Sequence, residues 1–255
     1  NIVIFRENTE DVYAGIEFAA GSERARQLGT LLGEWGSRIP DDAGLGIKVV
    51  SREKSRRLVR AAVRHAVAKG IGRVTLVHKG NIMKATEGAF AAWGYEVVRE
   101  EFAGLAIPAA DLPAGGPPPD VVVVDDRIAD AMFQDLLIAP QRFGVLATTN
   151  LNGDYLSDAA AAQVGGLGVA PGANLGEGIA VFEPTHGTAP DIAGKGLANP
   201  GSMMLTGALM LDVMGWTEAG ALVLDAFAAT LRDGRMTRDL VAGRAGIEAL
   251  STPAF

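Results

Sequence analysis

Short apolar runs alternate along the chain with longer stretches that have helical spacing. The purely aliphatic run at 121–124 is typical of a buried strand, and Leu58, Ala62 and Ala66 recur on one helical face. The strand-like runs are 2–5, 45–50, 74–77, 121–124, 145–148 and 179–182, and the helical stretches are 54–68, 84–93, 127–138, 155–164, 203–214 and 218–231. This alternation predicts an α/β fold.

Two stretches interrupt the alternation. Residues 104–119 are rich in proline, and we expect them to form an exposed connection. Residues 165–178 are rich in glycine but follow a helix. The classical dinucleotide-binding motif, G-x-G-x-x-G, instead lies between a strand and the helix that it opens. The pattern therefore argues against a Rossmann site. Three interpretations of residues 165–178 remain: a domain boundary, a plain interdomain hinge, or a nucleotide site of another design.

Composition narrows the class of protein. Hydrophobic residues make up 48% and charged residues 21%, as in an ordinary globular protein. The net charge of −7 argues against binding to nucleic acid or to an anionic membrane, and no apolar run approaches a membrane span. The absence of cysteine excludes disulfides, thiolate metal sites and a cysteine nucleophile. Because the chain begins with Asn1, we expect it to be a piece of a longer protein.

Three aspartates are candidate metal ligands. Asp154 and Asp158 stand four positions apart at the start of a predicted helix, hence on one face. One interpretation is that the partial positive charge of the helix N-terminus stabilises both acids. The other is a divalent cation, which prefers carboxylate oxygens. Asp130 favours the cation, because it falls in an apolar helical pattern where an acid needs a cation, a metal or solvent.

Basic residues follow two of the predicted strands. Arg6 comes directly after the first strand, and Lys79 follows the run that ends at His78. Charges at strand ends often line the ligand crevice of an α/β sheet, although each one separately is typical of a solvated strand end. His186 has no partner histidine at metal-ligand spacing, so a satisfied or cofactor-facing histidine is favoured. Together with the acids, these residues suit a small polyanionic molecule.

Five long blocks of sequence identify a family. They are FRENTEDVYAGIE (5–17), LVHKGNIMKATEGAF (76–90), NLNGDYLSDAAAAQVGG (150–166), GVAPGANLG (168–176) and EPTHGTAPDIAGKG (183–196). In content and order they resemble isocitrate dehydrogenase, a metal-dependent β-decarboxylating dehydrogenase. The group also holds isopropylmalate and homoisocitrate dehydrogenases, but the wording of the first block is similar to the isocitrate branch. The implied fold is the non-Rossmann α/β fold of this family.

The resemblance implies substrate and metal roles for single residues. Arg6 matches the residue that grips a substrate carboxylate, and Tyr13 matches the acid that protonates the enol carbon. Lys79 matches the proton acceptor, and Asn81 matches a residue that binds the substrate. The matching Mg²⁺ or Mn²⁺ ligands are Asp130, Asp154 and Asp158. Lys79 and Asp130 would come from the neighbouring subunit, so the resemblance implies a homodimer with shared active sites. The implied reaction converts isocitrate to 2-oxoglutarate and CO₂.

The resemblance also implies a nucleotide site. Its matching residues are His186, Gly187, Thr188, Ala189, Asp191, Ile192 and Asn199. NADP-using relatives carry Lys and Tyr where this chain has Asp191 and Ile192, and an aspartate repels a 2′-phosphate. Arg238 is able to bind a phosphate, but Ala242, at the other matching position, is not. We therefore predict NAD as the cofactor.

The resemblance predicts the domain plan. Residues 1–164 would form the small domain, with a dimer clasp at about 14–50. Residues 165–255 would form the C-terminal part of the large, nucleotide-binding domain. Because the family's upstream segment and its last helix are missing, we expect this fragment to be inactive by itself. We expect a cytoplasmic protein without nucleic-acid or membrane partners. The alternatives are homoisocitrate or isopropylmalate dehydrogenase, a regulatory homologue without catalysis, and an inert truncated product.

Overall fold

The computed structural model describes residues 2–242 and 246–255. The chain separates into two compact units, Asn1–Ser157 and Asp158–Phe255. The sequence predicted a boundary after residue 164, and the assignment of the units to a small and a large domain stays a prediction. Among the described residues, no helix combines the length and apolar character needed to cross a bilayer.

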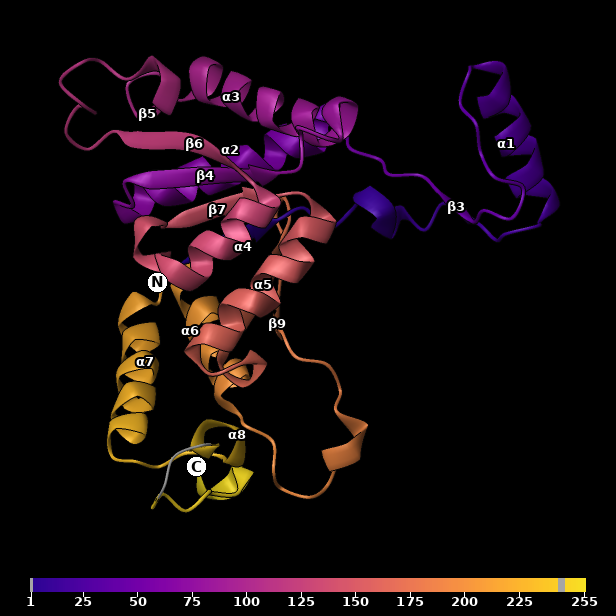
Figure 1. The fold of residues 1–255 in the computed structure, drawn as a ribbon. Helices are drawn as coiled ribbons and strands as arrows, with labels where there is room; N and C mark the ends of the chain where they lie inside the picture. The colour runs from indigo at the N-terminus through magenta and orange to yellow at the C-terminus, as the bar shows by residue number, and fades with distance from the viewer. Residues whose placement is uncertain (1, 243–245) are drawn as a thin grey trace. The chain divides into compact units, whose positions relative to one another are not determined.

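The first unit contains most of the regular structure (Figure 1). Its strands are β1 Val3–Arg6, β2 Glu17–Phe18, β3 Leu45–Gly46, β4 Arg73–His78, β5 Ala106–Pro108, β6 Val122–Ile128 and β7 Val145–Thr148. Its helices are α1 Glu23–Glu34, α2 Arg52–Lys69, α3 Ala89–Glu101 and α4 Ala129–Ile138, and α5 Asn150–Val164 runs across the boundary. A π-helical turn at Lys84–Gly88 leads into α3.

A five-stranded parallel sheet organises this unit. The strand order is β1-β7-β4-β6-β5, and each neighbouring pair runs parallel. Helices α2 and α3 pack against each other and against one face, and α4 lies on the opposite face (Figure 1). The α/β prediction is confirmed. Because the strands are parallel, their carboxyl ends meet at one edge, where a ligand crevice is expected.

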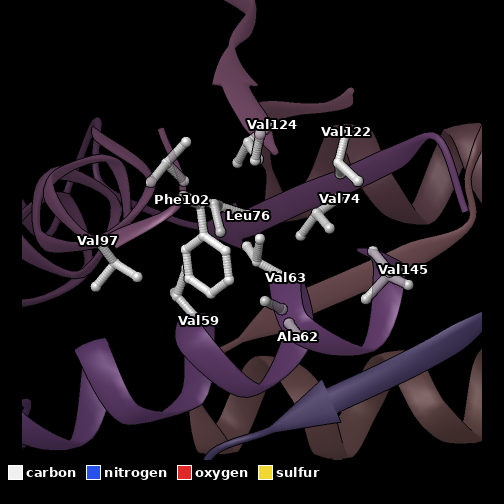
Figure 2. Close-up of a cluster of buried hydrophobic side chains, with 14 of the residues drawn as sticks. Val59, Ala62, Val63, Val74, Leu76, Val97, Phe102, Val122, Val124 and Val145 are labelled. Carbon is white, nitrogen blue, oxygen red and sulfur yellow. The ribbon is translucent and has the colours of Figure 1, made fainter. Parts of the chain in front are cut away.

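The hydrophobic core lies between the sheet and α2 and α3 (Figure 2). In β4, Val74 and Leu76 point into this core, whereas Thr75 and Val77 alternate with them and are also buried. Burial on both faces explains why the parallel strands are continuous apolar runs. Gly94 lets α3 approach β4, because a Cβ at this position would lie 2.7 Å from Leu76 Cδ1.

Three predicted segments differ from the observed structure. The expected strand at 45–50 pairs only over Leu45–Gly46, and beyond it the carbonyl of Val49 accepts a hydrogen bond from the amide of Asp11. The expected connection at 104–119 contains the edge strand β5, whose Ala106 is buried. Proline is compatible with such an edge position. The glycine-rich stretch 165–178 contains a strand as well.

The second unit is built on a two-stranded antiparallel hairpin. Its elements are β8 Pro171–Leu175, β9 Ala180–Pro184, α6 Gly201–Val213, α7 Thr217–Arg232 and the short α8 Arg238–Val241. Helix α6 packs on both strands, and α7 packs on α6. Many apolar side chains of α6 and α7 remain exposed, among them Met210 and Leu222.

Candidate active site

One cluster of predicted site residues lies at the carboxyl ends of β1 and β7. Arg6 is the last residue of β1, and its Nε and Nη2 donate to Asn150 Oδ1 at 3.0 and 2.7 Å. Arg6 Nη1 lies 2.8 Å from Asp154 Oδ1, and the guanidinium carbon lies 5.1 Å from the centre of the Tyr13 ring. The structure therefore brings together Arg6, Tyr13 and Asp154, which are distant in sequence.

Gly153 makes room for the arginine. A Cβ at this helical position would lie 2.5 Å from Arg6 Cγ and 2.9 Å from Arg6 Cβ. The stem of the arginine thus runs directly over the backbone of α5. Only glycine permits this approach without a shift of the strand or the helix.

Tyr13 lies in a short 3-10 turn, and half of its surface is exposed. Loss of water around the hydroxyl, followed by its hydrogen bond and charge interaction with Asp154, raises the pKa of Tyr13 above its ordinary value, although Arg6 opposes the shift. The phenol is therefore protonated at neutral pH. A protonated phenol beside a guanidinium is suited to donate a proton to a bound anion.

Asp154 and Asp158 lie one turn apart on α5. Because α5 already begins at Asn150, Asp154 stands beyond the first turn, where the effect of the helix N-terminus has faded. The side chain of Asp154 is 43% exposed, and Asp158 is exposed. The interpretation of these acids as helix-terminal residues loses its support, and both can offer oxygens to a cation.

A second cluster lies beyond the end of β4. Lys79 Nζ forms an ion pair with Asp130 Oδ1, and the hydrogen bond from Lys79 lowers the pKa of Asp130 below its ordinary value. Asp130 is in the first turn of α4 with its side chain 70% exposed, and not inside an apolar helix as the sequence suggested. Asn81 lies in the turn closed by Lys79 O, which accepts from the amides of Ile82 and Met83.

The two clusters do not merge within one chain. Across residues 2–242 and 246–255, no three His, Asp or Glu side chains gather in a way that would hold a metal ion. Asp130 is therefore not combined with Asp154 and Asp158. The contribution of a second subunit stays a prediction.

Sequence reasoning missed four polar residues beneath the clusters. Asn150 orients Arg6, and Lys48 Nζ lies 2.5 Å from Asp11 Oδ1 and 2.9 Å from Glu87 Oε1. The side chains of Asp11 and Glu87 are almost completely buried. Asp11, Glu87 and Asn150 lie inside three of the blocks that identify the family, which was the available signal. Lys48 lay in a run that was read as a strand.

The predicted nucleotide residues lie in the second unit, between β9 and the start of α6. His186, Gly187, Thr188 and Ala189 follow β9 directly, and Asp191 and Ile192 lie in a 3-10 turn. Asn199 precedes α6, and its Nδ2 donates to Asp239 Oδ2 at 2.8 Å. This bond holds the predicted adenine-side residue next to the short helix that begins with Arg238, whose side chain is exposed.

Comparisons with known proteins identify the same family as the sequence blocks. The family model for isocitrate/isopropylmalate dehydrogenase matches residues 1–255. The isocitrate dehydrogenase [NADP] of Archaeoglobus fulgidus is 53% identical over 94% of this chain, and that of Streptococcus mutans is 48% identical over all of it. The chain spans only 59% and 63% of these two relatives. A crystal structure of isocitrate dehydrogenase from Methylococcus capsulatus matches with a TM-score of 0.79 and 40% identity, covering 99% of this chain and 64% of that one.

The prediction of NAD as cofactor is wrong. The similar curated relatives, including that of Pseudomonas aeruginosa, are named as NADP enzymes. The prediction was based mainly on Asp191 and Ile192, which stand where NADP-using relatives carry Lys and Tyr. Asp191 is exposed, so water and salt screen its repulsion of a phosphate. Arg238, which precedes Asp239 of the Asn199–Asp239 bond, is exposed, and a guanidinium is suited to bind a phosphate.

Proposed function

Because this chain belongs to the isocitrate/isopropylmalate dehydrogenase family, we propose that it forms most of the catalytic chain of an NADP-dependent isocitrate dehydrogenase. The reaction is the oxidation of isocitrate by NADP⁺ to 2-oxoglutarate, CO₂ and NADPH. The observation that carries the proposal is the joint placement of Arg6, Tyr13 and Asp154 at the carboxyl edge of the sheet. Arg6 is suited to bind a substrate anion, Tyr13 to donate a proton and Asp154 to bind a cation.

Arg6 binds a carboxylate of the substrate. Asn150 already fixes Nε and Nη2 of the guanidinium, and Nη1 faces Asp154. A guanidinium held in this way loses little freedom when it forms charge-assisted hydrogen bonds to an anion. Tyr13, protonated beside it, then delivers a proton to the carbon that has lost CO₂.

Lys79 is the proposed acceptor of the hydroxyl proton. Its ammonium group is paired with Asp130 in the described structure, so Lys79 would accept the hydroxyl proton as the neutral amine, after it has released its own proton to solvent. Asn81, two residues later in the same turn, is proposed to contact the substrate.

Asp154 and Asp158 are the proposed ligands of Mg²⁺ or Mn²⁺, with Asp130 of a second subunit. The fit rests on their chemistry, because all three offer hard carboxylate oxygens and all are accessible to solvent. When bound, the metal would polarise the substrate hydroxyl and carbonyl oxygens. Arg6, paired with Asp154, orients that acid before any cation binds.

The proposed homodimer shares its sites between subunits. Mixing a Tyr13→Phe variant with a Lys79→Met variant tests this arrangement, because a mixed dimer regains one intact site. Activity that neither variant has by itself is expected after subunit exchange. A mixture as inactive as its components would contradict shared sites.

The experiment that tests the function measures NADPH formation at 340 nm. The complete gene product that contains this chain is assayed with isocitrate, Mn²⁺ and NADP⁺. Parallel reactions replace isocitrate with homoisocitrate or with isopropylmalate. We expect the highest kcat/KM with isocitrate and NADP⁺. A higher value with another 2-hydroxy acid would move the chain to a different branch of the family, and no activity with any of them would favour a regulatory homologue.

A further inference from the structure

A buried ammonium group joins two segments of the first unit. Lys48 Nζ lies between Asp11 Oδ1 at 2.5 Å and Glu87 Oε1 at 2.9 Å. The side chain of Lys48 is 15% exposed, and those of Asp11 and Glu87 are 1% and 0% exposed. Two buried carboxylates without a cation would be strongly unfavourable, so the ammonium group of Lys48 balances their charge.

Glu87 accepts hydrogen bonds from four donors. Oε1 accepts from Lys48 Nζ and from Thr149 Oγ1 at 2.7 Å. Oε2 accepts from Asn152 Nδ2 at 2.7 Å and from the backbone amide of Lys79 at 2.9 Å. The two oxygens of a carboxylate offer enough acceptor sites for this set. A glutamine at this position would turn its NH₂ group toward two of the donors in either orientation.

The other carboxylate holds the turn that carries the tyrosine. Asp11 has a φ of 76°, a conformation that is strained for a residue other than glycine. Its Oδ1 accepts from the amide of Val12 at 2.7 Å, and its Oδ2 accepts from the amide of Leu151 at 3.2 Å. Tyr13 follows two residues later. Lys48 thus stabilises the backbone near Tyr13 through Asp11, and the backbone at Lys79 through Glu87.

We propose that Lys48 is a positioning residue that holds two proton-transfer residues of the chain, Tyr13 and Lys79, through Asp11 and Glu87. The catalytic part of this inference rests on the proposed function. The structural part does not, because it concerns only the backbone amide of Lys79 and its acceptor Glu87. Lys48 itself does not touch the substrate.

The test compares Lys48→Met with Lys54→Met in the complete gene product. Lys54 is a matched control, because its Nζ lies 4.0 Å from Glu10 Oε2 and its side chain is 35% exposed. Hydrogen exchange of the Lys79 amide and steady-state kinetics are measured on both variants. We expect the Lys79 amide of Lys48→Met to exchange at least about tenfold faster, while the amides inside β4 keep their rates. We also expect kcat to fall by at least about tenfold, with little change in the KM for NADP⁺.

Each outcome decides one of the two claims. Faster exchange at Lys79 in a protein that does not oxidise isocitrate would sink the proposed function but keep the positioning role. Unchanged exchange and unchanged kcat in a folded Lys48→Met variant would overturn the positioning role. A variant that loses protection equally throughout β4 would overturn it as well, because the effect would then be general destabilisation. If Lys48→Met does not fold, Lys48→Gln, which removes the charge but keeps a polar side chain beside the two acids, is judged by the same exchange measurement.

Discussion

The substitution Gly153→Ala separates the stability of the chain from the function of Arg6. A methyl group at position 153 would lie 2.5 Å from Cγ and 2.9 Å from Cβ of Arg6. Real Cβ atoms do not approach this closely, and the atoms met are the base of the side chain, not its mobile end. The arginine stem must therefore move, and its guanidinium must leave the position fixed by Asn150 and Asp154.

The expected magnitudes differ for stability and activity. Alanine is about 1 kcal/mol more favourable than glycine inside a helix, and crowding in a packed site costs about 1–3 kcal/mol. The net loss of stability is therefore between about zero and about 2 kcal/mol. A misplaced charge-assisted hydrogen bond to the substrate costs about 1.5–3 kcal/mol, which corresponds to a roughly 10- to 160-fold fall in kcat/KM for isocitrate.

The assay measures kcat/KM for isocitrate and for NADP⁺ in the complete gene product, together with the melting temperature. The matched control is Gly207→Ala in α6, where a Cβ would meet no atom within 4 Å. The control is expected to keep its activity. A Gly153→Ala variant with unchanged kcat/KM for isocitrate would refute the role assigned to Arg6 and to the close approach of α5.

Three further predictions concern single side chains. Tyr13→Phe should lower kcat by about 10²-fold or more, because it removes the proton donor, and a loss below threefold in steady-state assays would argue against that role. Arg238→Ala should raise the KM for NADP⁺ but not for isocitrate, and this effect should weaken at high salt, whereas equal changes in both KM values would point to misfolding. The hydrogen bond from His78 lowers the pKa of Asp126, so this carboxylate stabilises the fold above its ordinary pKa of about 4 and loses that contribution as the pH falls. The difference in melting temperature between wild type and Asp126→Asn should therefore shrink from pH 6 to about pH 3, and a constant difference would contradict the pairing.

The central strands could be predicted because burial on both faces requires uninterrupted apolar residues. The run at 121–124 falls almost entirely within β6, and the runs at 74–77 and 145–148 match β4 and β7. Helix α2 was equally clear, since its buried face repeats at helical spacing. The edge strand β5 was missed because its proline-rich surroundings are typical of a loop. Helix α1 was missed because its sequence is polar on most sides and only Ala25 is buried.

The roles of the site residues were predictable only where a residue lies within a sequence block that resembles the family. The pairing of Lys48 with Asp11 and Glu87 joins residues separated by dozens of positions, and no local pattern indicates it. The same residue lies in the strand that was predicted too long. Lys48 belongs to an apolar run, and its ammonium group contacts the two buried acids, whereas the paired strand covers only Leu45–Gly46.

The order of the strands is compatible with the proposed second subunit. Arg6 ends β1, Lys79 follows β4, and β7 lies between them, so with about 4.8 Å between neighbouring strands the two backbones are about 10 Å apart. Lys79 is paired with Asp130, which follows β6, the strand on the far side of β4 from β1. Its ammonium group is therefore drawn away from Arg6 and Tyr13. In the proposed homodimer, a second copy of the chain would supply the lysine to a substrate held by Arg6 and would use the first chain's Lys79 in the same way.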